Sequence, residues 1–200
     1  RLEGFYFYWI SWCAWIVTTF ILDKNNALRM PLAIVLLVSI SLSIYMVQIG
    51  PIQISLTGLF LLLVSYTSFI IIHQGNFSNL VFRILCLTIF ATAFYLYALY
   101  DPFWIVVDLG LIQSIIFTCF ALFLFRDFII RITATTAGLI QSDVLYSLIL
   151  HDFYLDHPVA SLLFLDRLAL TQLAITGWTG LLYMRHLFQK NISWKKEKPM

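Results

Sequence analysis

The sequence predicts an all-α polytopic transmembrane helix bundle, and three observations support this fold class. Hydrophobic residues make up 62% of the 200 residues and charged residues only 11%, whereas a soluble domain carries about 25% charged residues. The apolar residues gather in long runs. No lysine occurs between Lys24 and Lys190. The chain is therefore expected to be surrounded by lipid and to cross the bilayer several times.

Each helix is predicted from one apolar run, because a span needs about 20 mostly apolar residues. Seven runs reach or approach this length: residues 5–22, 31–49, 52–72, 80–99, 103–125, 132–150 and 165–184. The first run is too long for the hydrophobic part of a secretory signal, so it is interpreted as a true span.

Very short connections predict that neighbouring spans form antiparallel helix hairpins. Gly50 and Pro51 join the second run to the third. Tyr100, Asp101 and Pro102 join the fourth run to the fifth. Both connections are expected to be tight turns between helices, with no room for an extramembrane domain.

The sixth run leaves two topologies open, because Gln141 and Asp143 lie near its centre. If residues 132–150 span the membrane, the bundle has seven spans. If they form an interfacial or re-entrant helix, the bundle has six.

The distribution of basic residues favours seven spans, because cytoplasmic loops carry an excess of lysine and arginine. With six spans, the twelve basic residues divide evenly between the two sides. With seven, ten lie on one side: Lys24, Arg29, Arg83, Arg126, Arg131, Arg185, Lys190, Lys195, Lys196 and Lys198. The prediction is a multi-pass cell-membrane protein with its N-terminus outside and its C-terminus in the cytoplasm. Residues 1–187 would form the bundle and residues 188–200 a basic cytoplasmic tail.

Asp143 is the most informative polar residue, because a carboxylate at the membrane centre costs about 2.5–3.5 kcal/mol and should face the bundle interior. Tyr146 and Ser147 follow it by about one helical turn and can share its face. Gln113 and Gln172 are expected at similar depth. These residues predict either a polar site of the kind that transporters and proton relays use, or hydrogen bonds that fix helix packing.

Small residues in the last two runs predict close packing between them. Gln172, Thr176 and Gly180 follow one another at intervals of four residues, which places them on one helix face. Small residues permit close approach of membrane helices, and residues 134–138 of the sixth run are also small. The two stripes are expected to face each other.

A second polar group lies in the predicted outer loop before the last span. Its members are His151, Asp152, Asp156 and His157, which are suitable ligand types for zinc or another divalent metal. The alternative interpretation is a solvated, capped turn. No cofactor is predicted.

No catalytic motif occurs: the chain has no phosphate-binding loop, nucleophile elbow or HExxH pair. The favoured function is that of a non-enzymatic accessory or scaffold component of the bacterial plasma membrane, with the lipid bilayer and a membrane-protein partner or second copy as its partners. The first alternative is a small-solute or proton-coupled transporter that uses Asp143. The second is a membrane-embedded metal-dependent hydrolase. The basic residues of the tail do not form a nucleic-acid-binding face.

The N-terminal residues 3–12, Glu-Gly-Phe-Tyr-Phe-Tyr-Trp-Ile-Ser-Trp, resemble the start of the YphA-like family of small membrane proteins from Bacillus and its relatives. The chain length, the tryptophan-rich first helix and the basic C-terminus are also compatible with that family. Its members are uncharacterised, so the resemblance implies a bacterial membrane protein and assigns no site residue.

Overall fold

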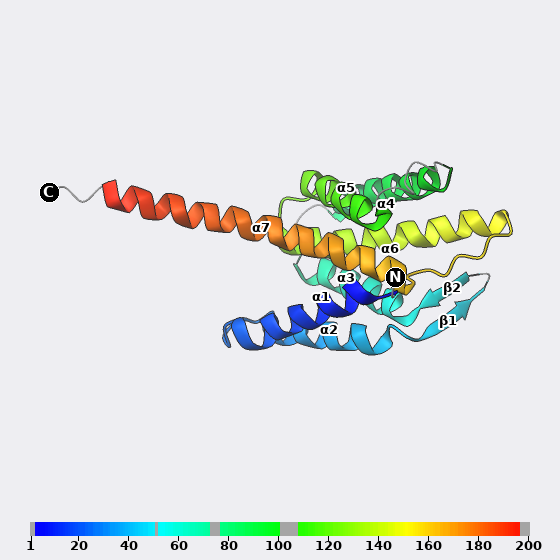
Figure 1. The fold of residues 1–200 in the computed structure, drawn as a ribbon, viewed down its shortest axis with the longest axis horizontal. Helices are drawn as coiled ribbons and strands as arrows, with labels where there is room; N and C mark the ends of the chain where they lie inside the picture. Colours follow the sequence, from blue (N-terminus) through cyan, green and yellow to red (C-terminus); the bar gives the residue numbers. More distant parts are fainter. Residues whose placement is uncertain (1–2, 51, 73–76, 101–107, 197–200) are drawn as a thin grey trace.

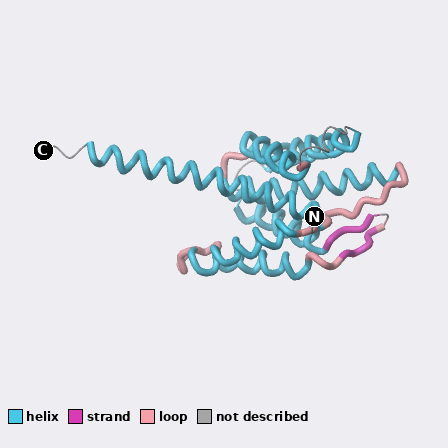
Figure 2. Tube along the Cα trace, viewed as in Figure 1, coloured by secondary structure: helices cyan, strands magenta, loops and turns pink. Residues whose placement is uncertain are grey.

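The computed structural model of the protein describes residues 3–50, 52–72, 77–100 and 108–196. The described residues contain seven α-helices and one two-stranded sheet (Figures 1 and 2). The helices are α1 (Phe5–Ile16), α2 (Arg29–Leu42), α3 (Leu56–Ile72), α4 (Phe77–Tyr100), α5 (Leu109–Leu124), α6 (Phe128–Asp152) and α7 (Leu162–Lys196). A π-helical segment, Val17–Ile21, continues α1. The mainly helical prediction is confirmed.

The helices pack side by side as a bundle, with α6 near its middle (Figure 1). Helix α6 packs against α3 and α4, and α7 packs against α1 and α5. The N-terminus, the sheet and the end of α6 lie toward one end of the bundle, which we call the hairpin end (Figure 1). The C-terminal half of α7 projects from the opposite end.

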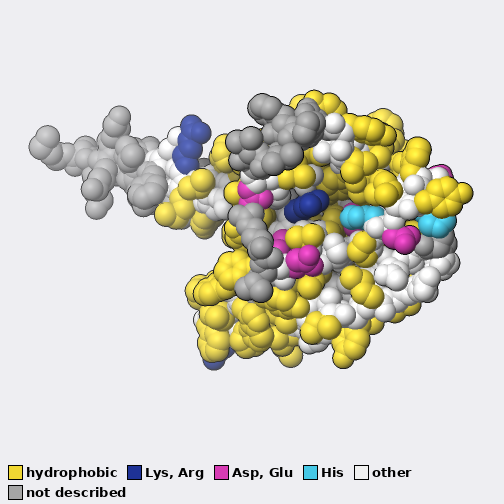
Figure 3. All heavy atoms as spheres, turned by 45° about the vertical axis from the view of Figure 1, so that its right-hand side comes forward, with side chains coloured by type: hydrophobic (Ala, Val, Ile, Leu, Met, Phe, Trp, Pro, Cys, Tyr) yellow, Lys and Arg dark blue, Asp and Glu magenta, His cyan; other side chains and the backbone are white. Residues whose placement is uncertain are grey.

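The bundle exposes large apolar side chains and buries many polar ones. Phe123 is 85% exposed and Ile71 is 79% exposed. Thr135, Ser142 and Thr171 are fully buried. Figure 3 shows one face on which charged and histidine side chains form a band surrounded by hydrophobic side chains. Lipid is the solvent that suits exposed apolar side chains, and the polar groups of a membrane protein turn inward toward one another.

Among the described residues, α4 alone is both long and apolar enough to cross a membrane, judged by length and composition. Four further apolar helices are shorter: Phe5–Ile21, Arg29–Leu42, Leu56–Ile71 and Leu109–Leu124. The number of spans therefore stays a prediction.

The prediction of a helix hairpin around Gly50 was wrong. Helix α2 ends at Leu42, and strands β1 (Met46–Ile49) and β2 (Ile52–Ser55) pair antiparallel before α3 begins. Apolar residues alternate with Gln48 and Gln53, which matches the two-residue period of a β-strand. The β-branched residues of this segment also favour strands. Gly50 has a φ of 61°, a conformation that suits glycine in a two-residue hairpin turn.

Helix α6 is continuous through the segment whose topology the sequence left open. It has 25 residues, which corresponds to about 37 Å at 1.5 Å per residue. Helix α7 has 35 residues and continues to Lys196. It therefore crosses residue 188, where the tail was predicted to begin.

Two arginines counted as cytoplasmic charges bind the C-terminal end of α5. Arg83 donates to the carbonyl oxygen of Leu124 at 3.1 Å. Arg131 donates through Nε to Phe125 at 2.9 Å and through Nη2 to Arg126 at 2.8 Å. Cations are favourable at a helix C-terminus, where carbonyl groups lack helical partners. These arginines therefore stabilise the bundle directly.

Candidate functional site

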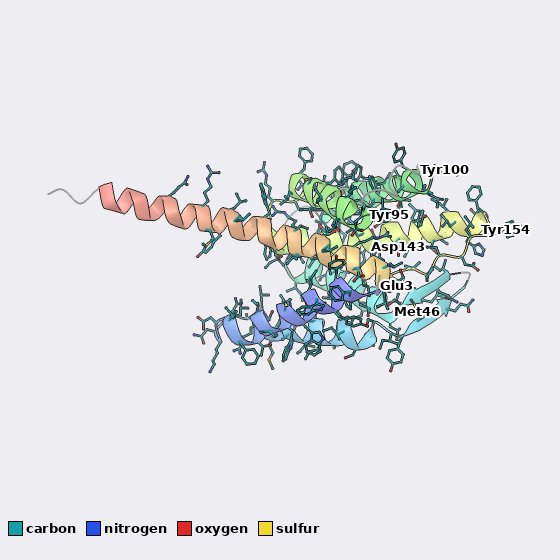
Figure 4. The ribbon with its side chains drawn as sticks, viewed as in Figure 1. Glu3, Met46, Tyr95, Tyr100, Asp143 and Tyr154 are labelled. Carbon is teal, nitrogen blue, oxygen red and sulfur yellow. The ribbon has the colours of Figure 1, made fainter. Side chains whose placement is uncertain are left out.

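Asp143 lies in the interior of the bundle on α6 and is only 3% exposed (Figure 4). Its Oδ2 accepts a hydrogen bond from the backbone N–H of Ala160 at 2.7 Å. Its Oδ1 lies 3.1 Å from Nε2 of His157. The carboxylate, which costs free energy to bury, is thus bound on both oxygens to the segment between α6 and α7.

That segment, residues 153–161, turns back into the bundle instead of remaining on its surface. Val159 and Ala160 are both fully buried. The N–H of Val159 donates to the carbonyl oxygen of Gln53 at 2.7 Å, and the N–H of Ser55 donates to the carbonyl oxygen of Val159 at 3.0 Å. The segment therefore connects β2 to Asp143, and we call it the inserted loop.

Close packing accompanies these hydrogen bonds. Ala160 has a φ of 52°, which is rare for a residue with a Cβ atom. A Cβ atom added to Gly58 of α3 would lie 2.5 Å from the Cβ of Ala160. Glycine at position 58 thus makes room for the inserted loop, and Asp143 fixes the strained residue that fills it.

His157 receives further contacts from α6. The hydroxyl of Ser147 donates to the carbonyl oxygen of His157 at 2.7 Å. The ring of Tyr146 meets the imidazole edge-to-face, with centroids 5.0 Å apart. The ring centroid of Tyr146 in turn lies 5.7 Å from that of Tyr95 of α4. Figure 4 shows Tyr95 near Asp143. Tyr146 and Ser147, which were predicted on the same helix face as Asp143, thus both contact His157, and their part in a polar site stays a prediction.

A pocket of about 280 Å³ opens at the hairpin end, between the sheet and the end of α6. Its lining residues are Gln48, Ile52, Gln53, Ser147, His151, Leu155, Asp156, His157 and Pro158. Most of its polar groups come from the sheet and the inserted loop. Among the described residues, the lining has one carboxylate, Asp156, two histidines, and no lysine or arginine.

Gln172 does not join Asp143, although the two were predicted as one polar site. Its side-chain nitrogen donates to the hydroxyl of Thr136 at 2.9 Å and to the carbonyl oxygen of Ile132 at 3.2 Å. Thr136 precedes Asp143 by seven residues, about 10 Å along a helix. Gln172 therefore links α7 to the first half of α6.

Gln113 is 1% exposed, and its Oε1 has no hydrogen-bond partner among the described residues. Its neighbour Ser114 donates to the carbonyl oxygen of Arg167 at 3.2 Å, which joins α5 to α7. The structure records no contact between Gln113 and Asp143.

The predicted contact between two small-residue stripes is only partly present. Gln172 reaches α6, but a Cβ atom added to Gly177 or Gly180 would meet nothing within 4 Å. Gly138 instead faces Leu87 of α4, since a Cβ atom there would lie 2.8 Å from its side chain. Beyond Gln172, Arg131 of α6 still donates to the hydroxyl of Thr179 at 3.4 Å, and the C-terminal half of α7 then projects past the bundle (Figure 1).

The four predicted metal ligands do not form one group. His157 pairs with Asp143, while His151, Asp152 and Asp156 are exposed. In the part of the chain that the structure describes, no three His, Cys, Asp or Glu side chains are placed to hold a metal ion. His151, Asp156 and His157 nevertheless share the pocket wall.

Asp166 has a role that sequence analysis missed. It is 8% exposed, and its carboxylate accepts from the N–H of Gly4 at 2.9 Å and of Phe7 at 2.7 Å. A carboxylate at a helix N-terminus satisfies free N–H groups and complements the helix dipole. The contact spans nearly the whole chain, so no local pattern could have revealed it.

Comparison with known proteins gives one family and one curated relative. The sequence model of a family described as "YphA-like integral membrane protein" matches residues 3–200. A Bacillus subtilis (strain 168) protein described as "Uncharacterized protein YphA" is 29% identical over 156 residues, which cover 74% of this chain and 73% of that protein. No solved structure matches.

Proposed function

Because the chain belongs to the YphA-like integral membrane protein family, we propose that it crosses a bacterial plasma membrane seven times. The hairpin end faces outward and the C-terminus lies in the cytoplasm. Ten of the twelve basic residues fall on the cytoplasmic side of this arrangement, as cytoplasmic loops require. Helices α2 and α5 have 14 and 16 residues, about 21 and 24 Å. Local thinning of the bilayer accommodates such short spans.

Within that membrane the protein acts as a non-enzymatic accessory or scaffold component. The observation that carries this proposal is the use of Asp143, whose two oxygens bind Ala160 and His157 of the same chain. Gln172 and Asp166 are likewise engaged in contacts between helices. A transporter would need such polar residues to carry a solute or a proton. In this proposal they instead form the contacts that hold the bundle together.

A transporter of small solutes is the second candidate, and the pocket favours it. His157 lines the pocket and also contacts Asp143, so one residue separates the pocket from the buried carboxylate. The unpartnered Oε1 of Gln113 is a further polar atom in the interior. In this alternative, release of the inserted loop would open the interior to the pocket.

Purification from native membranes at the natural expression level tests the scaffold proposal. We expect the wild-type chain and the Asp143→Asn variant to bring down the same stoichiometric membrane-protein partner, because Asn retains an oxygen that accepts from Ala160. Chemical crosslinking followed by mass spectrometry measures the partner and its ratio. A wild-type chain that is recovered alone in native lipid discs would contradict the proposal. So would a folded Asp143→Asn variant that loses the partner.

A further inference from the structure

The two edges of the hairpin are treated differently by the rest of the chain. On the outer edge of β2, the carbonyl oxygen of Gln53 and the N–H of Ser55 both bond to Val159. The inserted loop thus adds one extended residue to that edge, next to Ile54. The outer edge of β1 has no such cover among the described residues.

The pairing register identifies the free groups on β1. Tyr45 accepts from the N–H of Leu56 at 2.9 Å, and Val47 and Ile49 stand opposite Ile54 and Ile52. Antiparallel pairs alternate between bonded and non-bonded. The residues between these pairs therefore direct their N–H and C=O groups away from β2. Those residues are Met46 and Gln48.

The free edge lacks the features that usually protect an edge strand. Proteins protect such edges with charged residues, prolines or bulges. Strand β1 has the sequence Met-Val-Gln-Ile, and all four residues are exposed. Unpaired backbone groups on an exposed, uncharged strand are a template for another extended chain.

A second copy of this chain does not fit that edge. Copies in one membrane are related by rotation about its normal, so β1, which runs obliquely toward the hairpin end in Figure 1, points outward in both. Antiparallel self-pairing is then impossible. In a parallel pair of identical strands, one edge of the first strand meets the opposite edge of the second. A two-fold axis would instead bring the same edge of both copies together.

The pocket beside the hairpin indicates the chemistry of the partner. Gln48 of β1 and Gln53 of β2 stand opposite each other in the sheet, and both line the pocket with Asp156. Asp156 is the carboxylate of this lining, and the described residues add no lysine or arginine to it, so a side chain that enters beside Gln48 is favoured if it is a cation. Val47 and Ile49 alternate with Gln48, so their neighbours on an added strand should be apolar.

We propose that the free edge of β1 and the adjacent pocket bind an extended segment of a partner protein outside the membrane. That segment adds a strand beside Met46–Ile49 and places a lysine or arginine side chain near Asp156. This inference rests on the scaffold function, since it names the surface at which the scaffold holds its partner.

Fluorescence anisotropy with synthetic peptides tests the proposal on the full-length protein in phosphatidylcholine nanodiscs. We expect a seven-residue peptide of alternating valine and lysine to bind. The matching valine–glutamate peptide should bind about tenfold more weakly, because it meets Asp156 with a like charge. Methylation of alternate backbone nitrogens in the lysine peptide should abolish binding. Empty nanodiscs measure binding to lipid.

Two variants with matched controls locate the binding. Met46→Pro removes an outward N–H that takes no part in the β1–β2 pairing, and edge strands tolerate proline at such a position. The variant should bind the lysine peptide about tenfold more weakly than the wild type does. Met46→Val retains that N–H and should bind like the wild type. Asp156→Asn should reduce the preference for lysine over glutamate without disturbing the backbone.

Several outcomes overturn the inference. They are the absence of binding by the lysine peptide, equal binding of both peptides, tolerance of N-methylation, and unchanged binding by folded Met46→Pro. If the wild type forms a dimer in nanodiscs and Met46→Pro dissociates that dimer, the occupant of the edge is a second copy and not a partner protein. If Met46→Pro keeps the stoichiometric partner from native membranes, the scaffold proposal stands and this docking surface fails. If no partner is found, the scaffold proposal fails while the peptide titration still decides whether the edge binds a strand.

Discussion

Asp143→Ala is expected to destabilise the purified protein by about 2–4 kcal/mol, because the change leaves the buried N–H of Ala160 without an acceptor and removes the partner of His157. Loss of this anchor should release the inserted loop from β2. Thermal unfolding in detergent measures the stability. Hydrogen exchange measures release of the loop through the amides of residues 159–161.

Asp143→Asn is the matched control for this prediction. Its amide oxygen still accepts from Ala160, so the loss should be about 1 kcal/mol, the value of one altered hydrogen bond. If Ala and Asn variants lose the same stability, the backbone contact to Ala160 contributes little. If the Ala variant is as stable as the wild type, the anchor role of Asp143 is wrong.

Gly58→Ala is expected to destabilise the protein by about 1–3 kcal/mol, the usual cost of overpacking. The added methyl would lie 2.5 Å from the Cβ of Ala160, and Ala160 is fully buried. Ala160→Gly should rescue the variant, because glycine removes the opposing methyl and adopts a positive φ readily. Thermal unfolding of the two single variants and the double variant measures the coupling.

Gly177→Ala serves as the control for the glycine substitution. A Cβ atom at this position meets nothing within 4 Å. Alanine favours a helix over glycine by about 1 kcal/mol, so this variant should be as stable as the wild type or more so. A double variant at positions 58 and 160 that stays as unstable as Gly58→Ala would show that the close approach of α3 and the inserted loop has another cause.

The sequence predicted the parts of the fold that depend on local composition. Apolar runs located the helices, and the first helix carried the resemblance to the family that the chain belongs to. The burial of Asp143 was also expected, since charge in lipid must turn inward. By contrast, residues 43–49 and 52–55 were predicted as the ends of two helices because they are apolar. Their period-two alternation around Gly50 would have indicated strands.

The architecture around Asp143 could not be predicted, because its contacts depend on the path of the loop. The partners of Asp143 are 14 and 17 residues away, and those of Asp166 are 159 and 162 residues away. Residue type indicated that each carboxylate needs a partner. It did not indicate that backbone N–H groups would supply most of the contacts.

Labelling of single cysteines in intact cells with a membrane-impermeant thiol reagent tests the central claim most directly, namely that the protein is a seven-span bundle with a closed polar interior. The native Cys13, Cys86 and Cys119 are first replaced by alanine. Leu155→Cys in the inserted loop should react in intact cells, and Asp127→Cys between α5 and α6 only after permeabilisation. Ser142→Cys, fully buried beside Asp143, should react in neither state. Reaction of Ser142→Cys at the rate of Leu155→Cys, or of Asp127→Cys in intact cells, would contradict the account.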